Sequence, residues 1–145
     1  MNNIEFLYFI SDKMFFAVIC GILVGLERLF NHTTDKSPSM KIMILVTVGS
    51  MIFTALTKTS YNLDVETARI IGQIITGIGF LGAGVIMHKK NRVEGLTTSA
   101  FIWFLSSMGV LIGLDYGIIA LFITITLIMV ISIIHKIESK YINRK

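Results

Sequence analysis

Five apolar stretches, separated by short polar segments, make up most of the 145-residue chain. Each stretch approaches the roughly 20 mainly apolar residues that a helix needs to cross the hydrocarbon core of a membrane. They predict transmembrane helices at about residues 6–30, 42–57, 70–87, 96–114 and 116–134. Polar residues do not recur every few positions within them, as they would along the helices of a soluble domain. The pattern therefore predicts an all-α membrane bundle, forming a single domain over residues 1–145.

The composition agrees, with 54% hydrophobic residues, one proline and a mean hydropathy of +0.78. The start of the first helix is ambiguous, at about Ile4 or Asp12, because Asp12 and Lys13 interrupt the apolar run. This run resembles a secretory signal, but it ends in Gly-Leu-Glu-Arg without a small-residue cleavage site, so we expect a retained helix. The single cysteine, Cys20, has no partner for a disulfide and is expected to be a small packing residue.

The basic residues indicate how the chain lies in the membrane. The net charge of +4 does not predict nucleic-acid binding, because Lys and Arg stand between apolar runs, where anionic lipid and topology explain them. With five spans, three of the thirteen Lys and Arg fall on the side of the N-terminus and ten on the other. The excess predicts a cytoplasmic C-terminus and an external N-terminus. The basic tail, residues 135–145, is expected to lie along anionic headgroups.

Small residues recur along the predicted helices and suggest where helices pack closely, since close backbone approach drives association in lipid. The third helix carries them on two faces, so we expect it at the centre of the bundle. Alternatively, the glycines weaken this helix and allow a break lined by backbone carbonyls, as in transporters. Residues 77–82 match the GxGxxG pattern of nucleotide-binding folds, but no strand precedes them. The glycines expected to pack are Gly21, Gly25, Gly72, Gly77, Gly79, Gly82, Gly84, Gly109 and Gly113.

Ionisable groups within or beside membrane spans are costly and are candidates for function. Glu27 and Arg28, at the end of the first helix, are either a headgroup anchor with a snorkelling arginine or a buried pair. Arg69 is expected to pair with Asp115 or Asp12.

Further polar residues stand near helix ends. Gln73 is expected to hydrogen-bond across helices, and Thr97 or Thr98 to cap the fourth helix.

The carboxylates Asp64, Glu66 and Asp115, on the predicted outer side, are candidate ligands of a hydrated magnesium ion, which needs only one or two carboxylates. Loop carboxylates that are simply solvated are the alternative. No nucleophilic triad, metalloprotease motif or phosphate-binding loop appears, so we expect neither an enzyme nor a resident cofactor.

Three motifs resemble those of the MgtC/SapB family of membrane proteins. They are GILVGLER at residues 21–28, RIIGQIITGIGFLGAGVI at residues 69–86, and GLTTSA at residues 95–100 followed by Trp103. Together they span most of the chain in the family's order. The chain departs from the family at residues 39–42, Ser-Met-Lys-Ile in place of Gly-Leu-Arg-Thr, and we expect it to lack the soluble C-terminal domain of longer members.

The resemblance implies a multi-pass protein of the bacterial inner membrane, associated with growth at low magnesium, acid stress and survival in a host. It also implies that the functional residues are Glu27, Arg28, Arg69, Gln73, Thr97 and Thr98.

Two functions stay open at this point. The first is a non-enzymatic regulator that binds another membrane protein, or further copies of itself, through glycine-rich helix faces. The second is an oligomeric magnesium or proton transporter or channel lined by Glu27 and Arg28.

Overall fold

The computed structural model describes residues 3–31, 40–57, 63–89 and 92–142. In chain order the elements are α1 (Asn3–Asn31), α2 (Met40–Thr57), α3 (Leu63–Val85), β1 (Met87–Lys89), β2 (Arg92–Glu94), α4 (Leu96–Gly113) and α5 (Gly117–Ile142). All five helices are long and apolar enough to cross a membrane. The predicted all-α membrane bundle is confirmed, and the chain is a multi-pass membrane protein.

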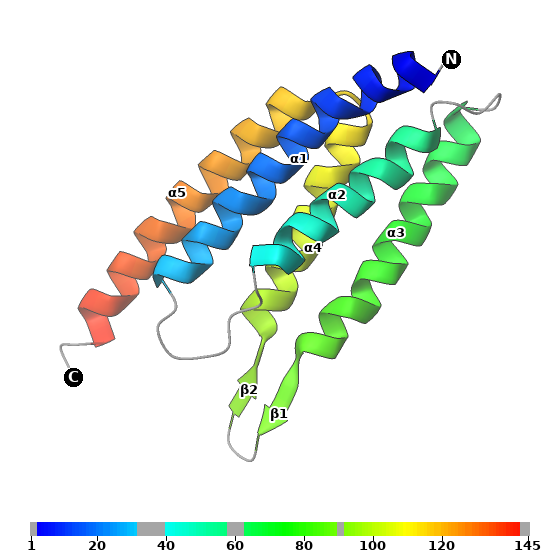
Figure 1. The fold of residues 1–145 in the computed structure, drawn as a ribbon. Coiled ribbons are helices and arrows are strands. Elements are labelled where there is room, and N and C mark those ends of the chain that lie inside the picture. The colour runs from blue at the N-terminus through cyan, green and yellow to red at the C-terminus, as the bar shows by residue number, and fades with distance from the viewer. Residues whose placement is uncertain (1–2, 32–39, 58–62, 90–91, 143–145) are drawn as a thin grey trace.

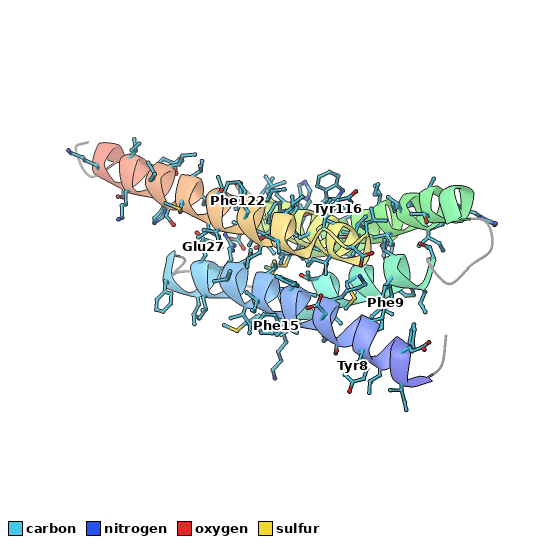
Figure 2. The ribbon with its side chains drawn as sticks, turned by 90° about the horizontal axis from the view of Figure 1, so that it is seen from above. Tyr8, Phe9, Phe15, Glu27, Tyr116 and Phe122 are labelled. Atoms are coloured by element: carbon cyan, nitrogen blue, oxygen red, sulfur yellow. The ribbon has the colours of Figure 1, made fainter. Side chains whose placement is uncertain are left out.

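The helices form two layers. α1 and α2 lie side by side in one layer, and α5, α4 and α3 form the other (Figure 2). α2 packs most extensively on α4, and α1 packs on α2 and α5. The N-terminus lies at one end of the bundle, while the β-hairpin and the C-terminus lie toward the other (Figure 1).

Small residues bring α2 and α4 together at the centre of the bundle. A Cβ atom added to Gly109 would lie 2.8 Å from Ser50 Cβ, and one added to Gly113 would lie 2.6 Å from Thr54 Cβ. Across the same interface, the hydroxyls of Ser50 in α2 and Ser106 in α4 form a hydrogen bond of 2.9 Å. Helices in lipid associate through such close contacts and shared hydrogen bonds.

The glycines of α1 serve the next contact. A Cβ atom on Gly21 would lie 2.7 Å from Ile44 Cα, and one on Gly25 would lie 2.7 Å from Met40 Cγ, so both glycines face α2. On a neighbouring face of α1, Cys20 is fully buried in the hydrophobic core.

The prediction that α3 lies at the centre is wrong. Only 11% of its membrane-spanning window is buried, against 50% for α4 and 44% for α2. Gly82 faces α4, since its added Cβ would lie 2.6 Å from Ser99 Oγ. The glycines with no atom within 4 Å of an added Cβ are Gly72, Gly77, Gly79 and Gly84. Small residues on two faces of α3 therefore do not mean two neighbours within this chain.

Between α3 and α4, β1 and β2 form an antiparallel hairpin in which Met87 pairs with Glu94 and His88 with Val93. It leads into α4 through Gly95, whose φ of 89° lies in the left-handed region. A Cβ atom there would overlap the carbonyl of Val85, so glycine is required by conformation and by space. Gly95 is also the N-cap of α4, and the expected threonine cap is wrong.

Two helices extend beyond their predicted bounds. α3 begins at Leu63 rather than near residue 70, and α5 continues to Ile142 rather than ending near residue 134. In both cases the added turns are polar. Hydropathy marks the part of a helix that lies in lipid, and polar residues can continue the same helix into water.

Candidate functional site

The centre of the candidate site is a contact between the end of α1 and the start of α4. Arg28 Nη2 donates a hydrogen bond of 2.8 Å to Thr98 Oγ1, although 70 positions separate the two residues. The guanidinium also lies over the ring of Phe101, 5.2 Å from its centroid, one turn further along α4. Both contacts place the charged end of Arg28 against the first two turns of α4.

Arg28 is not a snorkelling anchor. It is only 5% exposed, and Glu27 beside it is 7% exposed. Of the two alternatives for this pair, the structure favours the buried one. Successive residues of a helix point about 100° apart, so the two side chains leave α1 in different directions. Glu27 lies between α1 and the second layer of helices (Figure 2) and acts electrostatically on Arg28.

The Arg28 guanidinium is incompletely satisfied. Its Nε and Nη1 atoms are buried and have no hydrogen-bond partner in the described part of the chain. A buried donor without an acceptor costs about 1–3 kcal/mol, and more when it is charged. The site therefore has hydrogen-bonding capacity that its own side chains do not use.

The other candidates taken from the family motifs do not join this cluster. Thr97 is exposed beside buried Thr98, and Arg69 and Gln73 are exposed on α3. Gln73 does not form the expected hydrogen bond to another helix within the described residues. Instead it lines an apolar groove of about 640 Å³ between α2 and α3.

At the opposite end of the bundle, Lys13 of α1 forms an ion pair with Asp115 in the turn between α4 and α5. The expected pairing of Asp115 with Arg69 is therefore wrong. The Lys13 side chain is 6% exposed, and its ammonium group lies 4.2 Å from the centroid of the Phe9 ring. Sequence reasoning missed Lys13, although a charge inside an otherwise apolar run was a usable signal.

The magnesium proposal gains little support. Within the described residues no group of three or more His, Cys, Asp or Glu could hold a metal ion. Asp115 is engaged by Lys13. The side chains of Asp64 and Glu66 lie outside the described residues, so their part in the proposal stays a prediction.

Comparison with known proteins identifies the family of this chain. Residues 14–140 match the MgtC family. An uncharacterized protein of Haemophilus influenzae is 32% identical, over 94% of this chain and 59% of its own length. The "Putative magnesium transporter YhiD" of Escherichia coli is 27% identical, over 94% of this chain and 65% of its own. Protein SapB of Bacillus subtilis is 35% identical, over 72% and 47%.

The chain thus spans about half to two thirds of the length of these relatives. No solved structure matches it. The family match covers α2, α3 and α4 fully and most of α1 and α5, and it includes both sides of the Arg28–Thr98 contact. The chain belongs to the MgtC family of membrane proteins.

Proposed function

We propose that this chain is a non-enzymatic regulatory protein of the bacterial inner membrane, which binds another transmembrane protein in magnesium or acid-stress homeostasis. The homeostatic role is supported by the family and by the name of the Escherichia coli relative. A cytoplasmic C-terminus is supported by the excess of Lys and Arg at that end of the bundle.

The exposed face of α3 carries the proposal. Gly72 and Gly79 lie seven positions apart, and so on one side of the helix, and neither has an atom within 4 Å of an added Cβ. Glycines lower helix propensity, and the packing of these two within the chain does not require a residue without a side chain. A second transmembrane helix that packs closely against them would account for their presence. This helix belongs to another membrane protein or to a further copy of the chain.

Leucine at Gly79 tests the proposal, because the chain itself has space for the new side chain. In the Gly79→Leu protein the complex should be absent, as measured by its size in mild detergent or by cross-linking in native membranes. The thermal stability of the isolated protein should stay unchanged. Leucine at Gly82 would be a poor test, since it would collide with Ser99 of α4. Thr126→Leu, at an exposed position of α5, is the matched control. A complex of unchanged size in the Gly79→Leu protein would contradict the proposal.

An oligomeric ion transporter or channel is the second candidate. The observation that favours it is the burial of Glu27 and Arg28 at one end of the bundle, since buried charges in membrane proteins often mark ion pathways. Magnesium and proton flux into liposomes, measured for the wild type, Glu27→Gln and the exposed control Glu138→Gln, tests it. Flux lost only in Glu27→Gln supports transport, and absent flux from verified protein favours the regulator.

A further inference from the structure

Arg28 presents an unusual combination for a side chain at the end of a transmembrane helix. The residue is only 5% exposed. Two of its three guanidinium nitrogens have no hydrogen-bond partner in the described part of the chain. Only Nη2 is used, in the bond to Thr98. Because Nε and Nη1 are buried, bulk water compensates them poorly, and an acceptor from outside the chain would remove a substantial cost.

The start of α4 adds donors at the same place. The first N–H groups of a helix have no partner within the helix, and they favour negative charge. The N-cap of α4 is Gly95, which has no side chain to satisfy them. Thr98 lies within the first turn of α4 rather than at its cap. Its Oγ1 accepts from Arg28, and among the described residues its hydroxyl proton has no acceptor.

We infer that Arg28 and the N-terminal turn of α4 bind a phosphate group. A guanidinium fork, a threonine hydroxyl and helix N–H groups together suit a tetrahedral oxyanion that accepts several hydrogen bonds at once. Phosphate at this end of the bundle has two sources, inorganic phosphate and the headgroup of an anionic phospholipid. The Phe101 ring lies 5.2 Å from the centre of the guanidinium and packs against it. This site is separate from the exposed face of α3, so phosphate binding here and partner binding at α3 can be tested independently.

Glu27 interacts electrostatically with Arg28, and its negative charge would repel an anion bound nearby. Removing its charge in Glu27→Gln should strengthen phosphate binding. A cation held by the same cluster would respond in the opposite sense, since it would lose a carboxylate. The sign of the Glu27→Gln effect therefore separates the two ligand classes, and general damage to the fold does not mimic a gain.

The experiment uses the full chain purified in a mild detergent. Inorganic phosphate is titrated by calorimetry against a chloride control, and phosphatidylglycerol binding is counted by native mass spectrometry against phosphatidylcholine. The variants are Arg28→Gln, Arg28→Lys and Glu27→Gln. Arg69→Gln, which removes an exposed arginine of α3, is the matched control.

We expect Arg28→Gln to weaken binding about tenfold or more, since charge-assisted hydrogen bonds to phosphate are among the strongest in proteins. Arg28→Lys should lose part of the affinity, Arg69→Gln none, and Glu27→Gln should gain. The source that binds is the one for which this pattern appears. The inference is overturned if neither source binds the folded wild type, if Arg28→Gln and Arg69→Gln behave alike, or if Glu27→Gln weakens binding. Should Arg28→Gln not fold, Arg28→Lys and Glu27→Gln decide.

Discussion

Lys13 of α1 is paired with Asp115, in the middle of the three-residue turn between α4 and α5, so one ion pair connects three helices at one end of the bundle. Asp115 is the one described non-glycine residue with a positive φ, at 74°. Asp and Asn adopt this left-handed conformation more readily than most residues. The turn thus holds the carboxylate where the buried ammonium group needs it.

Asp115→Asn should destabilise the protein, because it keeps the turn conformation but takes the carboxylate from an ammonium group that is 6% exposed. Loss of one partner of a fully buried pair costs about 3–5 kcal/mol, and half-exposed Asp115 should reduce this to about 1–3 kcal/mol. Thermal unfolding in detergent measures the change. Lys13→Met in the same chain should restore much of the loss, and Asp12→Asn, at an exposed position, should change nothing. An unaltered transition in Asp115→Asn would show that the pair contributes nothing to stability.

Gly109→Ala should destabilise the contact between α2 and α4, because its methyl group would overlap the Thr47 carbonyl and approach Ser50 Cβ to 2.8 Å. Overpacking of this kind typically costs about 1–3 kcal/mol. Gly77→Ala is the matched control in a helix with open space, and it should be neutral or stabilising by up to about 1 kcal/mol, as helix propensity dictates. The two unfolding temperatures should therefore move in opposite directions or differ clearly. Equal shifts would mean that the α2–α4 contact relaxes without cost.

Gly95→Ala should disturb the passage from the hairpin into α4. The φ of 89° disfavours any residue with a Cβ, and that atom would overlap the Val85 carbonyl. Backbone strain of this kind costs about 1–3 kcal/mol, to which the steric overlap adds. Folding yield and thermal stability should both fall. Because Thr98 belongs to the first turn of α4, phosphate binding should weaken in the fraction that folds, whereas a wild-type yield and transition would contradict the prediction.

The sequence was sufficient to predict the five transmembrane helices, because within lipid a long apolar helix satisfies its own backbone hydrogen bonds. It was less informative about neighbours. The glycines of α1 and α4 face other helices, whereas Gly72 and Gly79 of α3 face outward, yet all have the same local pattern. Small residues indicate a helix face suited to close contact, but they do not indicate whether the contacting helix belongs to the same chain or to another protein.

The candidate site was predictable in part. Glu27, Arg28 and Thr98 stood in recognisable motifs, and the structure brings Arg28 and Thr98 together. The pairing of Lys13 with Asp115 was not foreseen, since residues 102 positions apart leave no local signal of their contact. The hairpin was also missed, because its strands are three residues each and carry no hydrophobic alternation long enough to detect.

The groove between α2 and α3 has a consequence for how α3 exchanges neighbours. Its lining is almost wholly apolar and its volume is about 640 Å³, so in a bilayer it is solvated by acyl chains. A helix that enters this groove, on the side of α3 opposite Gly72 and Gly79, exchanges contacts with lipid for contacts with protein, so burial of apolar surface supplies little net drive. Selectivity must then come from fit, and the thickness and order of the surrounding lipid become part of the binding equilibrium. The same partner helix would therefore bind α3 to different extents in membranes of different composition.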